Sequence, residues 1–259
     1  RKKKDIKGRG VVIKTVVTTN LIREICKDED VDLIGDLLVG YKYVAHEMNK
    51  LEEKEMMDNF IFGCEESHGY NTGNYAREKD SAPAAVWLAE LAAELKEDKK
   101  TLVDYLNDIY SKYGFFRNYL TEIRLPGAEG RGQIDKIQEN LRTNPPDLIG
   151  RFKVNKFDDY AHHKPIISET DAAAKNILVF ELEPVEGTIL IKVTVRPSGT
   201  EPKTKMYFEI SSNPFELSEM DKVKSTIEEI MKELEKDLLQ YCYRILGIDF
   251  PDRGFLLFW

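Results

Sequence analysis

The stretch TILIKVTVRPSGTEPKTKMYFEIS, Thr188 to Ser211, contains two strand-like runs joined by a polar loop. Apolar and polar residues alternate in part of each run, which is the period of a strand with one covered face. The runs RFKVNKFDDY (151–160) and NILVFELE (176–183) have the same texture, and Glu186-Gly187 supplies a turn signal. These runs together predict an antiparallel sheet with one buried face.

The buried face of that sheet needs a cover, and a long helix after Ser218 is the best candidate. Its apolar residues fall on one stripe at helical spacing, namely Val223, Ile227, Ile230, Leu234 and Leu238. The strand-like run YLTEIRLPG (119–127) and a short helix from Gln133 to Arg142, ended by Asn144-Pro145-Pro146, complete this half. We therefore predict an α+β domain at residues 119–259.

The first 118 residues have a different organisation, in which strands and helices alternate. Residues 11–19 and NFIFG (59–63) read as buried strands, and 31–39 is a short apolar run. Helical patterns cover 20–27, with Asn20 as N-cap, then a stretch from Gly40, 82–95 and 101–113. Thr101 and Asp104 form a capping-box variant at the last helix, and Gly114 ends it. This alternation predicts an α/β mixed-sheet domain at residues 1–118, with a boundary near residue 118.

The composition excludes several classes of protein. The chain has 259 residues, 42% of them hydrophobic, and a net charge of -8, which argues against disorder and against a nucleic-acid partner. No apolar run approaches the ~18 residues of a membrane span, and the basic start, Arg1 to Lys4, is followed by no signal-peptide pattern. Three distant cysteines without a CxxC spacing predict no disulfide framework and favour a reducing, cytoplasmic location.

The second polar loop, GCEESHGY, runs from Gly63 to Tyr70 directly after a predicted strand. Glu65, Glu66 and His68 lie too close along the chain to converge on a metal ion without a contorted loop, so we expect no metal ligands here. Ser67 and His68 are neighbours that diverge, which argues against a catalytic triad. Two interpretations of this loop remain. Its carboxylate, serine and imidazole groups could recognise a polyol, or the segment is simply an exposed acidic loop.

The loop RPSGTEPK, Arg196 to Lys203, has the chemistry of a phosphate site. Arg196 offers a planar cationic fork that matches phosphate oxygens, Ser198 and Thr200 offer hydroxyl groups, and Gly199 allows close approach of the backbone. Lys203 and Lys205 add positive charge. The alternative is a hairpin turn whose polar residues only cap the strand ends.

Taken together, the two loops resemble those of the α-D-phosphohexomutase superfamily, the phosphoglucomutases and phosphomannomutases. VGYKYV (39–44) and KDSAPAAVWLAELAA (79–93) resemble two further family segments, in matching order and spacing. Within the family, the sequence most resembles the phosphoglucomutase and phosphopentomutase branch. GYKY replaces the commoner G-F-K-W of the family. The resemblance implies an α/β third domain and a fourth domain like the TATA-binding-protein fold.

The resemblance also implies roles for individual residues. It implies that Glu65 and Ser67 bind the hydroxyl groups of the sugar, with His68 close by. It places Gly40, Tyr41 and Lys42 in the loop that sets substrate choice. It implies that the phosphate group that does not react is bound by Arg196, Ser198, Gly199, Thr200 and Lys203. The implied ligand is a phosphorylated hexose or pentose, and glucose, mannose and pentose phosphates all remain open.

The activity implied for the longer proteins is reversible phosphoryl transfer between the 1- and 6-positions of a hexose, through a phosphoserine and a bisphosphate intermediate. It comes with Mg²⁺ and a glucose 1,6-bisphosphate-type activator. The sequence contains neither a Ser-His-Asn-Pro run nor a DxDxDR run, which carry the serine and the magnesium in the family. We therefore expect the substrate-binding C-terminal half, with no catalytic residue or metal ligand of its own.

Several alternatives stay open at this point. The chain is expected to be a truncated or proteolysed piece of a longer protein that supplies the N-terminal catalytic domains, or else the product of a split gene, and by itself to be inactive. A stand-alone sugar-phosphate-binding module is the competing function, and an acidic interaction protein is a third. The tail GFLLFW, Gly254 to Trp259, is expected to pack on the second domain or to form an oligomer contact.

Overall fold

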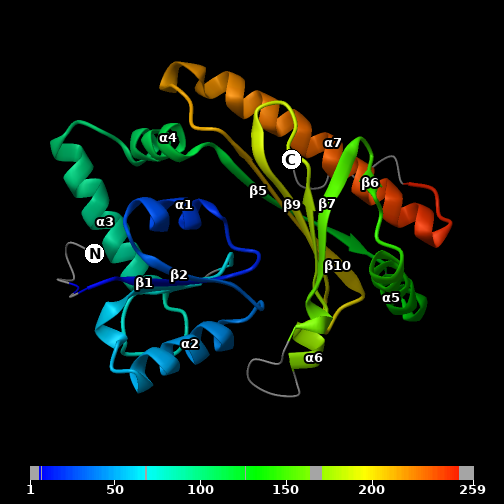
Figure 1. Cartoon of the computed structure of the whole chain (residues 1–259), viewed down its shortest axis with the longest axis horizontal. Helices are drawn as coiled ribbons and strands as arrows, with labels where there is room; N and C mark the ends of the chain where they lie inside the picture. Colours follow the sequence, from blue (N-terminus) through cyan, green and yellow to red (C-terminus); the bar gives the residue numbers. More distant parts are fainter. Residues whose placement is uncertain (1–5, 7, 68, 126, 164–170, 251–259) are drawn as a thin grey trace. The chain divides into compact units, whose positions relative to one another are not determined.

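The structure is a computed structural model, and it describes residues 6, 8–67, 69–125, 127–163 and 171–250 (Figure 1). The chain divides into two compact units, Arg1–Tyr113 with Pro165–Ala174, and Gly114–Lys164 with Lys175–Trp259. The predicted boundary near residue 118 lies inside strand β5 (Phe116–Arg124), which belongs to the second unit because it pairs with β10 (Lys203–Ser212). At the division, Gly114 has a φ of 98°, and a Cβ there would lie 2.2 Å from the carbonyl oxygen of Ser212.

The first unit is built on a four-stranded mixed sheet, with the order β2-β1-β3-β4. Strand β1 (Val11–Thr15) is parallel to both β2 (Asp32–Leu37) and β3 (Phe60–Cys64), whereas β4 (Tyr70–Asn71) is antiparallel to β3. Helix α1 (Leu21–Asp28) and helix α2 (Tyr41–Glu53) lie on opposite sides of this sheet (Figure 1). The predicted α/β mixed-sheet fold is confirmed.

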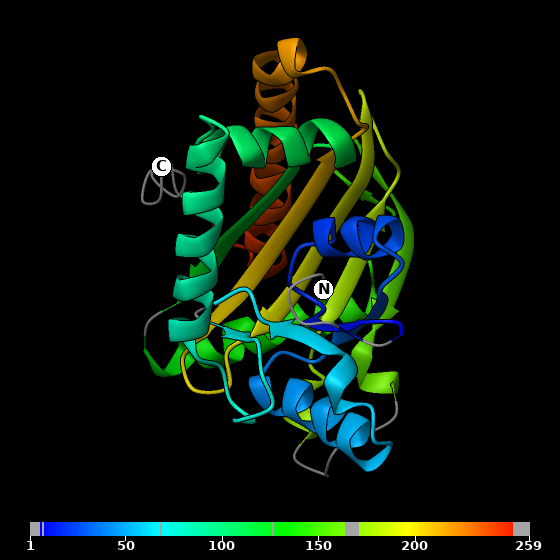
Figure 2. The same cartoon turned by 90° about the vertical axis from the view of Figure 1, so that its left-hand side faces the viewer.

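Two further helices complete the main body of the first unit. Asp80 caps α3 (Ser81–Glu97) by accepting the Ala82 N–H at 2.9 Å, and α3 leads into α4 (Leu102–Tyr113), as Figure 2 shows. The predicted capping box of α4 is present, because Thr101 Oγ1 accepts the Asp104 N–H at 3.1 Å and Asp104 accepts the Thr101 N–H at 2.8 Å. A short helix, α6 (Asp171–Ala174), also belongs to this unit.

Helix α3 is unusual because it is rich in apolar residues that are not covered. Only Leu95 is buried along its length, while Val86 and Leu88 are 57% and 54% exposed. Apolar residues all round a helix normally indicate burial. Within the described residues, these side chains therefore contribute little to the core of the first unit.

The second unit contains a six-stranded sheet with the order β5-β10-β9-β8-β7-β6, in which all neighbouring strands are antiparallel. The four predicted runs correspond to β7 (Phe152–Asp159), β8 (Leu178–Leu182), β9 (Thr188–Pro197) and β10, and β6 (Leu148–Ile149) adds a short edge. Short 3-10 helices occur at Met57–Asn59, Tyr160–His162 and Leu217–Glu219. The predicted antiparallel sheet is confirmed.

One face of this sheet is covered by α5 (Ala128–Thr143) and by the long helix α7 (Met220–Leu246), which Figure 1 shows along the strands. Four members of the predicted apolar stripe of α7 are buried, and Val223, nearest the start, is half-buried. Helix α5 begins before Gln133, where the sequence pattern predicts its start. The pattern does not reveal the first turns because Gly130 and Gly132 weaken the helical signal there. The tail at 254–259 lies outside the described residues.

No helix in the described ranges has both the length and the apolar character that crossing a membrane requires. The three cysteines, Cys26, Cys64 and Cys242, are buried free thiols. Burial raises the pKa of both Cys64 and Cys242 to about 12, so these thiols are protonated and unreactive near neutral pH.

Candidate functional site

The polar loop after β3 is a tight turn that returns the chain to β4. Cys64 pairs with Tyr70 across the two strands, and the Glu65 N–H donates to the Gly69 carbonyl oxygen at 2.9 Å. A Cβ on Gly69 would lie 2.9 Å from the Glu65 Cβ, so this turn requires a glycine. Glu66 and Ser67 are exposed, as expected for an acidic loop, but Glu65 is buried at 7% exposure. His68 lies outside the described residues.

The carboxylate of Glu65 joins segments that are distant in the sequence. Its Oε1 accepts the Gly40 N–H at 2.7 Å, and its Oε2 accepts the Lys79 ammonium at 2.9 Å. Lys79 also donates to the Ser67 carbonyl oxygen at 3.3 Å. The hydrogen bond to Glu65 raises the pKa of Lys79 and keeps its ammonium charged. The Glu65 cluster, defined as Gly40, Glu65, Ser67 and Lys79, is therefore one connected polar group.

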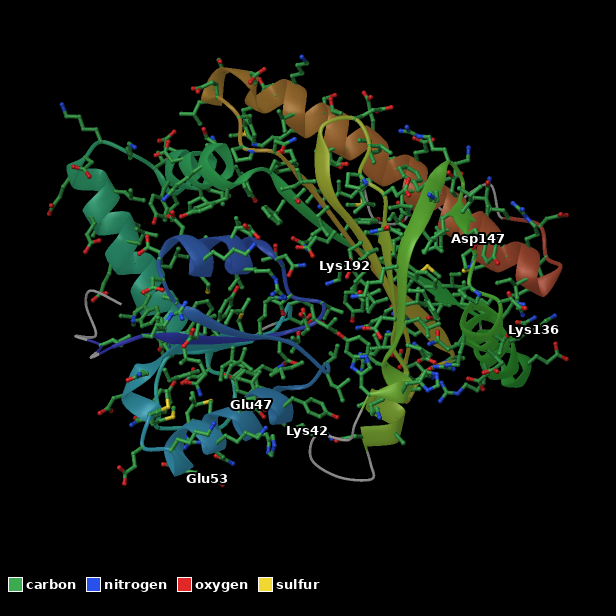
Figure 3. The ribbon with its side chains drawn as sticks, viewed as in Figure 1. Lys42, Glu47, Glu53, Lys136, Asp147 and Lys192 are labelled. Atoms are coloured by element: carbon green, nitrogen blue, oxygen red, sulfur yellow. The ribbon has the colours of Figure 1, made fainter. Side chains whose placement is uncertain are left out.

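The start of α2 contributes the remaining residues that were predicted for the first unit. Gly40 is the N-cap, with a φ of 133° that only glycine adopts readily. The next side chain, Tyr41, is directed into the core, and burial raises the pKa of its hydroxyl. Lys42 is half exposed at the same helix end (Figure 3). Of the segment predicted to set substrate choice, Lys42 presents the accessible side chain.

Lys42 is held by a carboxylate that sequence reasoning missed. Asp171, at the start of α6, is buried, and its Oδ1 lies 3.5 Å from the Lys42 ammonium. The same oxygen accepts the hydroxyl of Tyr43 at 2.9 Å. The Lys42 ammonium lies 4.9 Å from the centre of the Tyr43 ring. Asp171 follows a segment without a clear pattern, so nothing in the sequence marked it as a partner of Lys42.

In the second unit, the loop between β9 and β10 is closed by hydrogen bonds among its own residues. We call this loop, Arg196 to Lys203, the Arg196 loop. The Ser198 N–H donates to the Lys203 carbonyl oxygen at 2.8 Å. The Ser198 hydroxyl oxygen accepts the N–H groups of Thr200 and Glu201 at 3.4 and 3.2 Å. A Cβ on Gly199 would meet open space, so the tip of the loop is accessible. Ser198 thus shapes the turn as well as offering a hydroxyl.

The two cations predicted to bind phosphate differ in their surroundings. The Lys203 ammonium lies 2.7 Å from Glu201 and 3.3 Å from Glu122. Its hydrogen bond with Glu201 raises the pKa of Lys203 and lowers the pKa of Glu201. Arg196 has no ion pair with any carboxylate in the described part of the chain. The Arg196 guanidinium is therefore the better candidate for an incoming anion, and a phosphate role for Lys203 stays a prediction.

Arg131 is a further residue at this loop that sequence reasoning missed. From the first turns of α5, its guanidinium donates to the carbonyl oxygens of Ser198 at 2.6 Å, Gly199 at 3.1 Å and Glu201 at 3.2 Å. The helical pattern became visible only from Gln133 onward, so Arg131 was not placed on a helix. No spacing in the sequence linked it to the loop.

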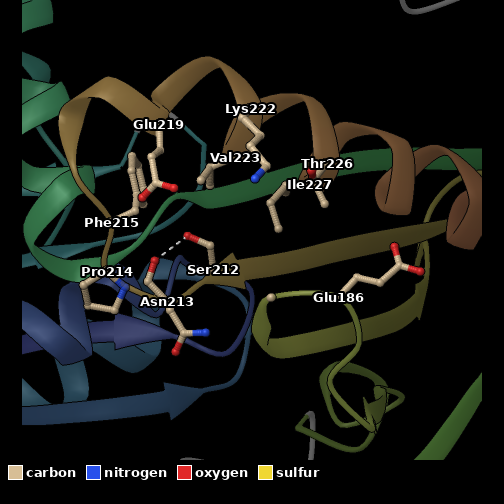
Figure 4. Close-up of a pocket in the computed structure, with 11 residues that line it drawn as sticks. Glu186, Ser212, Asn213, Pro214, Phe215, Glu219, Lys222, Val223, Thr226 and Ile227 are labelled. Atoms are coloured by element: carbon tan, nitrogen blue, oxygen red, sulfur yellow. Dashed lines mark hydrogen bonds between the residues drawn. The ribbon is translucent and has the colours of Figure 1, made fainter.

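A cavity of about 300 Å³ lies elsewhere in the second unit, between the end of β10 and the start of α7 (Figure 4). Its wall includes the side chains of Ser212, Asn213, Phe215, Lys222 and Thr226, and the Ser212 hydroxyl donates to the Asn213 carbonyl oxygen at 2.8 Å. None of the predicted site residues that the structure describes lines it. This cavity is therefore separate from the Arg196 loop.

Carboxylates in the described part of the chain form no metal centre. No group of three or more His, Cys, Asp or Glu side chains there has an arrangement that could hold a metal ion. The oxygens of Glu65 are instead satisfied by a backbone N–H and an ammonium.

The fold and the two loops define the class of this protein as a mixed-sheet α/β unit followed by an α+β unit, each with a polar loop at a strand end. Residues 1–113 match the family described as phosphoglucomutase/phosphomannomutase, alpha/beta/alpha domain III. The chain belongs to the phosphohexomutase superfamily and corresponds to the C-terminal region of its members.

Individual relatives agree with this placement. The phosphoglucomutase of Staphylococcus haemolyticus (strain JCSC1435) is 30% identical over 220 residues, which cover 84% of this chain and 39% of that protein. The phosphoglucomutase of Staphylococcus aureus (strain MRSA252) is 31% identical over 212 residues, which cover 80% and 37%. The chain thus spans about two fifths of the length of these curated relatives.

A solved structure shares the fold. The open form of parafusin from Paramecium, an exocytosis-sensitive phosphoprotein also described as a phosphoglucomutase, superposes with a TM-score of 0.55 and 12% identity. The match covers 94% of this chain and 39% of parafusin. At this identity the likeness establishes the fold alone.

Proposed function

We propose that this chain is the substrate-binding region of a phosphosugar mutase, which moves a phosphoryl group between the 1- and 6-positions of a hexose phosphate. The observation that carries the proposal is the Glu65 carboxylate, which connects Gly40 and Lys79. These contacts draw together three segments that resemble the substrate-facing parts of the family. A cytoplasmic location and a phosphorylated hexose or pentose as ligand belong to the same proposal.

Glu65 is suited to bind two neighbouring hydroxyl groups of a sugar. A carboxylate has about four lone-pair positions, and the contacts from Gly40 and Lys79 use one on each oxygen. Because both oxygens are fixed by these contacts, the remaining lone pairs point in defined directions. Ser67, which is exposed two residues further along the loop, offers a hydroxyl donor. This arrangement favours a ligand with vicinal hydroxyls over a simple anion.

The Arg196 loop is suited to hold the phosphate that does not react. Arg196 supplies charge and a bidentate fork, and Gly199 leaves the tip of the loop open. Contacts to a remote phosphate orient the sugar and contribute binding energy that lowers the barrier of the distant chemical step. The role proposed for this chain is to bind and orient the substrate.

The chemistry itself is assigned to groups that this sequence does not contain. Magnesium and a glucose 1,6-bisphosphate-type activator belong to the activity proposed for the longer protein, where the metal would stabilise negative charge on the transferring phosphoryl group. The described residues do not fit a magnesium site. We therefore propose that the 259-residue chain alone binds sugar phosphates without converting them.

Calorimetry with glucose 1-phosphate and with inorganic phosphate tests this proposal on the purified chain. We expect glucose 1-phosphate to bind more tightly, Arg196→Met to weaken both ligands, and Glu65→Gln to weaken only the sugar phosphate. A mutase assay on the same sample is expected to show no turnover. Equal affinity of the wild type for both ligands, or unchanged binding after both substitutions, would contradict the proposed roles.

A further inference from the structure

The guanidinium of Arg131 makes three contacts to the backbone of the Arg196 loop. They end on the carbonyl oxygens of Ser198, Gly199 and Glu201, at 2.6, 3.1 and 3.2 Å. A planar guanidinium with five N–H donors can serve several carbonyl groups at once. All three contacts are made by the side chain of Arg131, so this side chain connects α5 to the loop carbonyls.

These contacts fix the direction in which the loop presents its amide groups. In a trans peptide, the C=O of one residue and the N–H of the next point in opposite directions, and the described chain has no cis peptide bond. Because the Ser198 and Gly199 carbonyls point toward Arg131, the N–H groups of Gly199 and Thr200 point to the opposite side. The Thr200 N–H also makes a long hydrogen bond of 3.4 Å to the Ser198 hydroxyl oxygen. Consecutive N–H groups on one side of a turn form a concave site for an anion.

The position of Arg131 is itself determined by close packing at the start of α5. A Cβ on Gly130 would lie 1.7 Å from the Leu125 carbonyl oxygen, so the helix approaches the end of β5 with glycine at this point. The Leu125 N–H in turn donates to the Pro202 carbonyl oxygen of the loop at 3.1 Å. The strand end, the helix start and the loop are thus held together around Arg131.

We propose that Arg131 is a positioning residue for the Arg196 loop, whose backbone it holds so that the N–H groups of Gly199 and Thr200 face an incoming phosphate group. This inference deepens the proposed function and rests on it, because it assumes that the Arg196 loop binds phosphate. Arg131 acts through the backbone and touches no ligand. Arg196 supplies the direct charge contact.

The chain offers a matched control for the loss of charge. Arg124 also lies beside the loop, with Nη1 3.5 Å from a carboxylate oxygen of Glu201, and it is 60% exposed. It makes no hydrogen bond to a loop carbonyl among the described residues. Arg124→Met and Arg131→Met remove the same charge near the same loop, but only the second removes the carbonyl contacts. Arg131→Lys keeps the charge without the planar fork.

The first measurement is amide hydrogen exchange of the full chain without ligand. The N–H groups of Ser198, Thr200 and Glu201 are bonded within the loop. We expect Arg131→Met to speed their exchange about tenfold relative to the wild type, because the loop opens locally more often. Arg124→Met is expected to change exchange by less than about twofold. Equal exchange in all three proteins would overturn the role of Arg131.

The second measurement is the affinity for inorganic phosphate and for glucose 1-phosphate. If the competent loop shape becomes a minor population, the apparent affinity falls by that fraction. We expect about a tenfold loss for Arg131→Met, a smaller loss for Arg131→Lys, and little loss for Arg124→Met. Equal losses for Arg131→Met and Arg124→Met would reduce Arg131 to a source of charge and overturn the inference.

Arg196→Met separates this inference from the proposed function. One outcome is that Arg196→Met loses binding strongly while Arg131→Met binds and exchanges like the wild type. That result would support the phosphate site and contradict the positioning role of Arg131. A wild-type chain that binds neither ligand, or binding that Arg196→Met leaves unchanged, would instead contradict the proposed function. Faster loop exchange in Arg131→Met would then still show that Arg131 orders the backbone, without a phosphate role.

Discussion

The Lys79 ammonium lies 2.9 Å from Oε2 of Glu65, and the Gly40 N–H lies 2.7 Å from Oε1 of the same side chain. The pair is asymmetric, because the Lys79 side chain is 33% exposed and the Glu65 side chain only 6%. A buried carboxylate with both oxygens engaged supports the local fold. Glu65 therefore has a structural role in addition to the binding role proposed for it.

Glu65→Ala is expected to destabilise the first unit by about 2–4 kcal/mol, because the substitution removes one partner of a largely buried ion pair and leaves the Gly40 N–H without its acceptor. Urea unfolding measures it, with the exposed neighbour Glu66→Ala as the control at within about 0.5 kcal/mol. Equal stability of the two variants would show that the Glu65 contacts have no net value.

The burial of Glu65 illustrates where sequence reasoning ends. The strand before the loop and the glycines within it are local features, and each was readable from composition and pattern. The partners of Glu65 come from the start of α2 and from the segment before α3, so burial depends on how distant elements meet. A loop with two adjacent carboxylates looks solvated in sequence, and only the tertiary contacts separate Glu65 from Glu66.

The second unit shows the same limit in a different way. The strands β7 to β10 and the stripe on α7 were predicted because their periods repeat over many residues. Arg131 was missed because the glycines around it hide the start of α5, and Asp171 was missed because its surroundings carry no period. The contacts of both residues are set by tertiary packing, which no single-sequence pattern encodes.

Because the apolar side chains of α3 are uncovered, we expect a valine-to-alanine substitution to affect stability less in α3 than in the buried part of α2. Val44 in α2 is fully buried, whereas Val86 in α3 is 57% exposed. Val44→Ala is expected to cost about 2 kcal/mol through lost burial and a residual cavity. Val86→Ala is expected to be neutral or stabilising by up to about 0.5 kcal/mol, because alanine has the higher helix propensity. Thermal unfolding of both variants checks this, and a large cost at Val86 would reveal a hidden partner for α3.

The contact between Tyr43 and Asp171 predicts a measurable coupling free energy. The Tyr43 hydroxyl donates to Asp171 Oδ1 at 2.9 Å, and both side chains are buried. Asp171→Ala is expected to cost about 2 kcal/mol because it leaves the buried hydroxyl without this acceptor, and Tyr43→Phe less. In a double-mutant cycle of unfolding free energies, we expect a coupling of about 1–2 kcal/mol. Simple additivity of the two changes would rule out a stabilising contact.

Glu235 predicts a pH dependence with a definite sign. It lies on α7 at 2% exposure, and burial raises the pKa of its carboxyl group, against the opposing effect of hydrogen bonds from Thr121 and Tyr119. A raised pKa means that the folded state prefers the protonated form. The contribution of Glu235 to stability is therefore most favourable at low pH, and it declines as the pH rises from about the ordinary value of 4.5 through the raised pKa of the folded state.

Glu235→Gln keeps the shape of the side chain and removes the charge. At pH 8 the variant is expected to be more stable than the wild type by about 1 kcal/mol, because the wild type must then bury an ionised carboxylate. Near pH 4 the wild-type group is largely protonated, so the difference is expected to vanish. Urea unfolding of both proteins across this range measures the difference, which cancels titrations that the two proteins share. A gap that is constant with pH would show that Glu235 does not titrate with the shifted pKa.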